Sequence, residues 1–437
     1  MTYSVKDVLK MEVAPALGCT EPVAIALASA AATSLLPREA IDSLEVWVTP
    51  NIYKNGLAVL IPGTPELSGL DLAAALGVFG GDPTLGLEVL ESLDDEKVEL
   101  AGAFIREPGV KVNILSGNEG LRIQARVKGG GHVGEAVIER THNNLTALSL
   151  DGNPVTDSPL LAGSSGEGRP ERADFDKWVK SLSLERLLEL VDDLDQEDID
   201  FLKQSVELNM RLAEYGLKHG PALGIGKTLQ RLVRQKLLKE DMVLAARMLT
   251  SAASDARMGG VKLPAMSSAG SGNHGLTAVL PIWAVRDYIE CDLDTIYKAI
   301  GFSHLVTSYV KAHTGRLSAL CGCSIAAGAG ATAAITYLLG GDLNHIAGAI
   351  KNLMEDLAGV ICDGAKAGCS LKLATAAGHA VQSALFALQG VSVEATDGII
   401  AGTMEQTTQN LGQLSAYGMV EADRTILKIM MEKHIHA

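Results

Sequence analysis

The chain has 437 residues, enough for two or three domains, and a formal net charge of −15 at pH 7. Proteins that bind nucleic acid through its phosphates present a basic surface, so this charge argues against that class and suits a protein that handles small molecules. Only 4% of the residues are aromatic, whereas 47% are hydrophobic and 46 are glycines, which predicts closely packed helices rather than an aromatic-filled β-sandwich.

The N-terminus carries charged residues at Lys6, Asp7 and Lys10, which interrupt the apolar core that a signal peptide requires. Residues 317–341 contain no charged side chain and residues 373–393 none apart from one histidine, so both stretches reach the length of a membrane span. The first is rich in Gly, Ser, Thr and Cys and lacks an aromatic belt or a basic flank. We interpret both as buried helices at the centre of a soluble, cytoplasmic protein.

The first elements expected are helices at residues 4–12 and 20–36. Thr20 is a suitable N-cap for the second helix, and Pro22 lies in its first turn. Cys19 would then precede a helix N-terminus, where backbone N–H groups and the helix dipole lower the pKa of a thiol.

Residues 41–150 differ in pattern, because alternating apolar residues replace the helical periodicity. The segments that predict strands are SLEVWVTP, GLAVLIPG, VKVNILSG, LRIQARVK, HVGEAVIERTHNN and LTALSLDG. Short helices are expected at residues 70–77 and 85–93, and Gly and Asn residues mark the turns. These elements predict an α+β module with an antiparallel sheet.

Residues 152–172 are rich in Gly, Ser and Pro and predict a linker, and nearly every segment after them has helical periodicity. The fold class is therefore α+β: the α+β module is followed by a large all-α domain with buried Ala/Gly-rich central helices. The expected units are N-terminal helices that pack on the helical domain (1–40), the sheet module (41–151), the linker (152–172) and the helical domain (173–437).

Four of the six cysteines lie close together in the sequence: Cys321 and Cys323 in ALCGCSIAAGAGATAA, and Cys362 and Cys369 in GVICDGAKAGCSLK. Clustered thiols in a chain without an export signal indicate a metal or iron–sulfur site rather than disulfides. Alternatively, any single cysteine can be a small hydrophobic residue of the core without a chemical role, and we assign this role to Cys291. C-x-C followed by C-x6-C matches neither a usual zinc pair nor a ferredoxin run. Three thiolates on one cluster would leave one iron open as a Lewis acid.

Two further segments could contact a substrate. A loop of hydroxyl groups and free N–H groups before a helix suits a carboxylate or a phosphate, although an ordinary capping loop has the same composition. Its candidate residues, in MSSAGSGNHGLTAVLP, are Ser267, Ser268, Ser271, Gly272, Asn273 and His274. The segment IERTHNNL places His142 and Asn143 at the end of a strand, where a lone histidine is usually exposed. A phosphate-binding loop at ALGIGKTLQ is excluded because Pro221 occupies the position of the first glycine.

Several segments taken together resemble the L-cysteine desulfidases of bacteria and archaea, which are related to the iron–sulfur L-serine dehydratases. These segments are PALGCTEPVAIA, NIYKNGLAVLIPG, SSAGSGNHG, CGCSIAAGAGATAA and CDGAKAGCSLK, and the resemblance covers nearly the whole chain. It implies an oxygen-sensitive [4Fe-4S] cluster that is held by three cysteines and leaves one iron free for the substrate. The implied ligands are Cys323, Cys362 and Cys369, with Cys321 as the alternative to Cys323.

The resemblance also implies a reaction, the β-elimination of L-cysteine to pyruvate, ammonia and sulfide. Cys19 is the candidate base, and His274 and His142 are candidates for binding or proton transfer. The Ser/Gly/Asn loop and the His142–Asn143 pair would lie near the substrate. We therefore expect the helix start at Thr20 to pack against the loops that carry Cys323 and Cys362, and we expect a homodimer that binds a small amino acid.

Two other functions are kept as alternatives. The first is an iron–sulfur L-serine dehydratase, which performs the same elimination on a hydroxyl group. The second is a non-catalytic redox or metal-binding protein, in which Cys321 would add a fourth thiolate and close the site.

Overall fold

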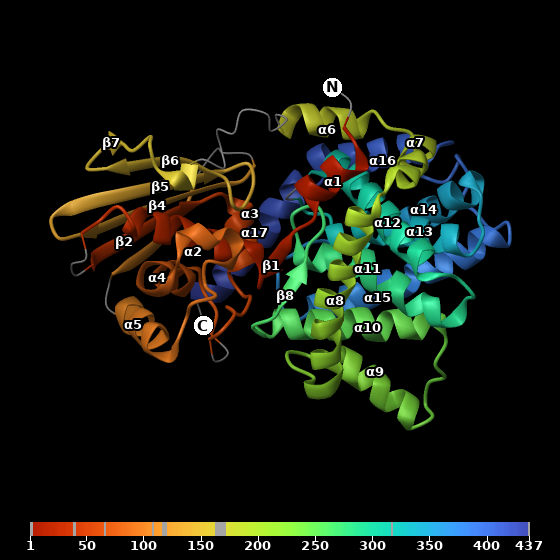
Figure 1. Ribbon diagram of the computed structural model, residues 1–437, viewed down its shortest axis with the longest axis horizontal. Helices are drawn as coiled ribbons and strands as arrows, with labels where there is room; N and C mark the ends of the chain where they lie inside the picture. Colours follow the sequence, from red (N-terminus) through yellow and green to blue (C-terminus); the bar gives the residue numbers. More distant parts are fainter. Residues whose placement is uncertain are drawn as a thin grey trace.

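The computed structural model describes residues 3–37, 41–64, 67–106, 109–115, 120–161, 172–315 and 318–435. It contains a sheet with its own covering helices and a larger part made almost wholly of helices, which lie side by side in Figure 1. The predicted α+β class is confirmed.

The sheet has the strand order β3-β2-β4-β5-β6-β7. The strands are β2 (Ile41–Val48), β3 (Val110–Ile114), β4 (Arg122–Gly129), β5 (His132–Glu139), β6 (Leu145–Leu150) and β7 (Asn153–Pro154). All neighbouring strands are antiparallel except β2 and β3, which are parallel, so the predicted antiparallel sheet is mixed at one edge. A parallel pair requires a long crossover connection, and here helices supply it. The prediction of a strand at GLAVLIPG is wrong. Helix α3 (Pro50–Gly56) extends to the first residue of this segment, and the segment then forms only an isolated bridge between Leu60 and Ser68.

Helices cover one face of the sheet. They are α2 (Thr20–Thr33), α4 (Leu70–Gly80), the 3-10 turn η1 (Pro83–Glu88) and α5 (Asp95–Arg106). Leu44, Val46 and Val48 point from β2 into the same apolar cluster as the alanines of α2. Helix α2 ends three residues before the expected position 36 and has Cys19, not Thr20, as its N-cap. The helix expected at 85–93 is replaced by η1.

The helical part contains most of the remaining elements. They are α1 (Val5–Glu12), α6 (Arg172–Lys180), α7 (Leu184–Glu189), η3 (Leu190–Asp193), α8 (Gln196–His219), α9 (Ile225–Arg234), α10 (Met242–Met258), α11 (Gly272–Val285), α12 (Leu293–Thr314), α13 (Gly328–Leu338), α14 (Leu343–Leu357), α15 (Cys369–Leu388), α16 (Met404–Gln413) and α17 (Val420–Ile435). Helix α13 is buried from Gly328 to Thr336, because a helix that is apolar on all sides takes a central position.

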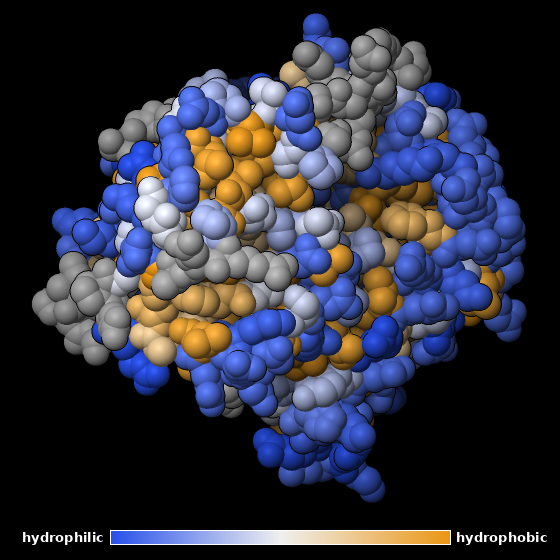
Figure 2. Space-filling view, turned by 60° about the vertical axis from the view of Figure 1, so that its left-hand side comes forward, coloured by the Kyte–Doolittle hydropathy of each residue, from blue (hydrophilic) through white to orange (hydrophobic). Residues whose placement is uncertain are grey.

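The surface in Figure 2 is hydrophilic over much of the face shown, with apolar patches near its centre. Among the residues that the structure describes, no helix has both the length and the apolar character needed to cross a membrane. The two uncharged stretches noted in the sequence largely form α13 and α15, whose buried residues belong to the helical core.

The two parts are connected by short pairings between distant segments. Strand β1 (Pro15–Leu17) pairs antiparallel with β8 (Pro264–Met266), and the Ser267 hydroxyl donates a hydrogen bond of 2.7 Å to the carbonyl of Ala14. Helix α17 returns to the sheet part, where Asp423 forms an ion pair with Lys54 of α3.

The core residues suggest how the chain is divided. Residues of α1 belong to the helical core, whereas residues of α2 belong to the core beneath the sheet. We therefore propose that α1 groups with the helical domain and α2 with the sheet module, so that the expected 1–40 unit is split. Of the proposed linker, residues 162–171 lie outside the described part of the chain, and β7 and the turn Pro159–Leu161 precede them.

Gly77 tests the close packing of α4 on α2. A Cβ atom at this position would lie 2.2 Å from the carbonyl oxygen of Ala26, a rigid backbone atom. We expect Gly77→Ala to lower the free energy of unfolding by about 1–3 kcal/mol, measured by chemical denaturation. The matched control is Gly102→Ala in α5, where a Cβ meets no atom within 4 Å; the added helix propensity should raise stability by up to about 1 kcal/mol. Equal effects at both positions would contradict this account of the α2–α4 contact.

Candidate active site

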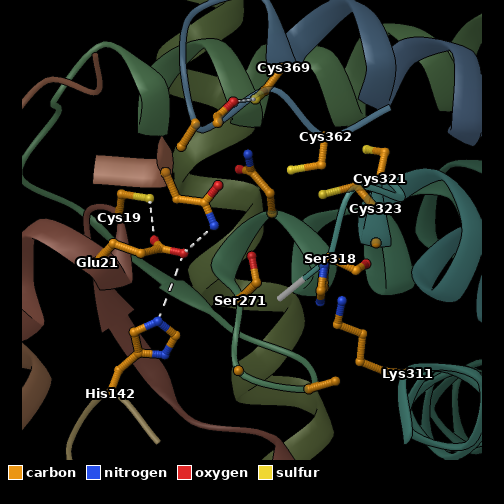
Figure 3. A pocket seen from close by; sticks show the side chains of 18 of the residues that line it. Cys19, Glu21, His142, Ser271, Lys311, Ser318, Cys321, Cys323, Cys362 and Cys369 are labelled. Carbon is orange, nitrogen blue, oxygen red and sulfur yellow. Dashed lines mark hydrogen bonds and ion pairs between the residues drawn. The ribbon is translucent and has the colours of Figure 1, made fainter. Parts of the chain in front are cut away.

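A cavity of about 880 Å³, including its opening to solvent, lies between the sheet part and the helical part. Its wall is formed by the start of α2, the turn between β5 and β6, the end of α10, the start of α11, and the two cysteine segments (Figure 3). Segments from opposite ends of the chain therefore meet around one enclosed space.

The four clustered cysteines all line this cavity as free thiols. The two segments that carry them are paired: the N–H of Cys321 donates to the carbonyl of Val360 at 2.9 Å, and the N–H of Cys362 donates to that of Ala319 at 2.6 Å. Cys369 is the first residue of α15. Contact with the Cys323 thiol lowers the pKa of Cys321, and contact with Cys321 together with burial raises the pKa of Cys323, so Cys321 is the more acidic thiol of the two.

The loop from Cys362 to Cys369 is seated on α3. Gly364 has a φ of +92°, and a Cβ there would lie 2.3 Å from the carbonyl oxygen of Lys54. The N–H of Ala365 donates to the carbonyl of Asn55 at 3.3 Å. Only glycine combines this backbone conformation with such a close approach, so the cysteine loop is held against the sheet part.

Cys19 lies on the opposite side of the cavity from Cys321, Cys323 and Cys362 (Figure 3). Its thiol donates a hydrogen bond of 3.0 Å to Oε2 of Glu21. Burial raises the pKa of Cys19 well above its usual value, and the charge of Glu21 adds to this effect. The expectation that the helix N-terminus lowers this pKa is wrong, because burial and the neighbouring carboxylate outweigh the dipole.

Arg257, at the end of α10, is the main buried cation of the cavity. Its guanidinium donates to the carbonyl of Gly18 and, at 3.0 Å, to Oδ1 of Asn273. No carboxylate lies within ion-pair distance of it in the part of the chain that the structure describes. Gly272 makes room for it, since a Cβ there would lie 2.4 Å from the guanidinium Nε. The side chain is thus oriented by neutral groups and has its charge available for an anion.

Lys311 of α12 brings a second buried cation next to His274. A Cβ at Gly322 would lie 2.4 Å from Nε2 of His274 and 2.9 Å from Nζ of Lys311. Both side chains therefore approach the backbone between Cys321 and Cys323. Burial lowers the pKa of His274 well below its usual value, and the charge of Lys311 acts in the same direction. The imidazole is therefore neutral at pH 7.

Four helical segments start at the cavity wall. Cys19 is the N-cap of α2, Ser271 is the N-cap of α11, Cys369 begins α15, and Cys323 begins the π-helical turn that continues as α13. The first N–H groups of a helix have no intrahelical partner and carry a partial positive charge. At α15 and the π-helical turn the first N–H groups donate to the preceding turn, as Cys369 does to the carbonyl of Lys366 at 2.9 Å. The starts of α2 and α11, together with Arg257 and Lys311, make the cavity favourable for anions.

The other predicted site residues divide into two groups. His142 lies in the turn between β5 and β6, where its ring is largely buried in the cavity wall, and Ser271 also lines the cavity. Asn143 is exposed and accepts a hydrogen bond from Thr141, so its position gives no support for the expected contact with substrate.

Ser267 and Ser268 also lie outside the cavity lining. Ser267 binds the backbone of Ala14, and the hydroxyl of Ser268 contacts Nδ1 of His304 at 2.9 Å. Gly272 is absent from the lining, and its lack of a side chain leaves space for Arg257. These residues shape the site rather than line it.

The expected contact between the start of α2 and the cysteine loops is only partly formed. Ala365 and Cys369 pack against the apolar cluster that contains Cys19, which confirms the contact for the 362–369 loop. Cys323 faces Cys19 across the cavity instead of contacting it (Figure 3).

Sequence reasoning missed Glu21, Asn55, Arg257 and Lys311. Glu21 lies within the same GCTEP segment as Cys19, Asn55 lies within NIYKNGLAVLIPG, and Lys311 is the only lysine or arginine of residues 299–314, so these three left a signal. Arg257 had none, because its place in the cavity follows from contacts between distant segments. Cys291, assigned to a buried role, is exposed.

The sequence model of the serine dehydratase alpha chain family matches residues 84–428 of the chain. The chain belongs to this family. It is also 61% identical to a UPF0597 protein of Desulfatibacillum aliphaticivorans over 99% of both chains, and 45% identical to one of Clostridioides difficile over 97% of this chain and 98% of the relative. The family membership agrees with the resemblance found in the motifs.

Proteins of this family generally depend on iron–sulfur chemistry, and the donor set of the cavity fits such a group. Four thiols from two paired loops surround one space, and the neighbouring cations offset the negative charge that thiolates bring. In the described ranges, no three His, Cys, Asp or Glu side chains converge as they would on a single metal ion. A cluster does not require such convergence, because each cysteine binds a different iron.

Serine substitutions test which thiols are ligands. We expect Cys362→Ser and Cys369→Ser each to remove most of the iron from anaerobically purified protein, because a hydroxyl replaces a thiolate ligand. Of the two cysteines in CGC, Cys323 and Cys321, we expect Cys323→Ser to remove the iron and Cys321→Ser to retain it. Iron and sulfide quantitation, with Cys19→Ser as the control that retains iron, measures this. A similar loss in Cys321→Ser and Cys323→Ser would instead indicate four ligands and a closed site.

Proposed function

We propose that the protein is an iron–sulfur-dependent lyase that eliminates sulfide from L-cysteine. The observation that carries this proposal is the combination, in one cavity, of four free thiols with Arg257 and Lys311, two buried basic side chains that have no carboxylate partner among the described residues. A thiol-rich site that also attracts anions suits a cluster and a carboxylate substrate together.

The reaction has a simple balance. The Cα–H and Cβ–S bonds of L-cysteine break and a Cα–Cβ double bond forms, which releases sulfide and aminoacrylate. Aminoacrylate takes a proton at Cβ to give an imine, and water hydrolyses the imine to pyruvate and ammonia. The protein must therefore bind the carboxylate, remove the Cα proton and return a proton to carbon. A cluster with an open iron supplies Lewis-acid polarisation of the bound substrate.

The residues of the cavity provide these functions. Arg257 and the first N–H groups of α11 bind the substrate carboxylate, and Asn273 holds the guanidinium in place. Cys19 is the proposed base for the Cα proton; it rests as a thiol, and a positive group bound beside Glu21 would offset the carboxylate charge and favour the thiolate. His274 presents a neutral imidazole as the second proton-transfer group.

L-Serine is the second candidate substrate, and the match to the serine dehydratase alpha chain favours it. The segment PALGCTEPVAIA, with Cys19 in the cavity wall, supports L-cysteine because it resembles the desulfidases. Both reactions use the same carboxylate site and the same proton transfers, and they differ in the group that leaves Cβ.

A substrate panel decides between the two. We expect cluster-loaded protein under anaerobic conditions to release pyruvate from L-cysteine at least about tenfold more efficiently than from L-serine, which corresponds to about 1.4 kcal/mol in transition-state binding. Sulfide release in equal amount to pyruvate is the matched readout. Faster turnover of L-serine would assign the dehydratase activity, and no pyruvate from either amino acid would contradict the proposal.

Cys19→Ala tests the proposed base. Turnover should fall by about 10²–10⁴-fold, the usual contribution of general acid–base catalysis, while the iron content and the visible absorbance of the cluster remain unchanged. Loss of iron in this variant would make Cys19 a ligand instead of a base. Unchanged turnover would assign proton abstraction to another group.

A further inference from the structure

Glu21 is a buried carboxylate that lines the cavity without a basic side chain bound to it. Glu21 is 7% exposed. Among the described residues, the titratable basic group in contact with it is the imidazole of His142, whose Nε2 lies 3.8 Å from Oε1. Burial lowers the pKa of His142, so this ring is neutral near pH 7. Burial raises the pKa of Glu21, but the neighbouring His142 and the hydrogen bonds from Cys19 and Asn55 lower it, and the net shift is downward, so the carboxylate is ionised.

The hydrogen bonds of Glu21 leave one acceptor site open. Oε2 accepts from the thiol of Cys19 at 3.0 Å and the hydroxyl of Thr20 at 3.1 Å, and Oε1 accepts from Nδ2 of Asn55 at 3.0 Å. An ionised carboxylate has about four acceptor sites. The contact of Oε1 with His142 is too long for a hydrogen bond, and His142 Nε2 has no partner of its own among the atoms described. Figure 3 shows Cys19, Glu21 and His142 together on one side of the cavity.

Among the described residues, the basic group within 4 Å of this buried carboxylate is the His142 ring, which does not hydrogen-bond to it, so Glu21 can receive a cation. Arg257 lies nearby without pairing to it: Glu21 is bound to Cys19, whereas Arg257 is bound to the carbonyl of Gly18, the preceding residue. The cavity thus holds a negative group, Glu21, and a positive group, Arg257, which are bound to the adjacent residues Cys19 and Gly18 and not to each other. An α-amino acid carries the complementary pair of charges on a single carbon.

We propose that Glu21 binds the α-ammonium group of the substrate through the open site on Oε1, while Arg257 binds its carboxylate. This inference rests on the proposed function for the identity of the substrate class, and it adds the residue that selects amino acids over carboxylic acids without an amine. Asn55 and Thr20 are positioning residues, because their donors orient the carboxylate of Glu21.

The experiment compares two ligands that cannot undergo elimination. L-Alanine has no leaving group at Cβ, and propionate is the same molecule without the amine. Calorimetry on anaerobically purified, cluster-loaded protein should show that wild type binds L-alanine about 10–100-fold more tightly than propionate, as expected for a charge-assisted hydrogen bond to a buried group. In Glu21→Gln this ratio should fall to about one.

Glu12→Gln is the matched control. Glu12 is also a buried glutamate, 4% exposed, but it contacts Arg172 and is absent from the lining of this cavity. The control should keep the preference for L-alanine. Iron content and circular dichroism establish that both variants are folded and loaded.

Each outcome is decisive. The inference is overturned if wild type binds propionate as tightly as L-alanine, if it binds neither ligand, or if Glu21→Gln keeps the preference. A variant that loses turnover of L-cysteine but keeps the preference would make Glu21 only a positioning residue for Cys19. A retained alanine preference without any elimination would remove the proposed reaction and leave the ammonium site standing.

Discussion

The convergence of four helix starts on one cavity is the constraint on which the rest of the structure depends. The N–H groups of Ile325 and Cys369 donate to the carbonyls of Cys321 and Lys366, so the starts of α2 and α11 are the ones that remain to receive an anion. Glu21 lies at the start of α2, and the proposed substrate carboxylate would lie at the start of α11.

Arg257 and Glu21 lie in the cavity as separated charges and do not form an ion pair with each other. Arg257 is oriented by Asn273 and a backbone carbonyl, and Glu21 is oriented by a thiol, a hydroxyl and an amide. Neutral donors and acceptors hold each charge in place without cancelling it. A ligand with both charges can therefore replace water at both groups, at a lower desolvation cost than breaking an internal ion pair.

Much of the fold and part of the site could be predicted from the sequence. The helices, most strands and the four cysteines have local signals: periodicity, turn residues and close spacing. The strand expected at GLAVLIPG failed because Pro50 starts a helix immediately before it and tertiary packing overrode the local β-propensity. The pKa of Cys19 was misjudged because the dipole is a local effect, whereas burial and the Glu21 contact depend on the folded chain. No sequence pattern indicated Arg257, because its place in the cavity also depends on the folded chain.

The pairing of Lys54 with Asp423 has a consequence for the order in which the protein matures. The N-terminal wall of the cavity leaves the ribosome first, but the cysteine loops and α17, which are seated on α3, are among the last segments synthesised. Contacts between such distant segments close late, since long loops must be ordered first. The cavity, and any group that its thiols hold, can therefore be completed only after Cys369 has been translated.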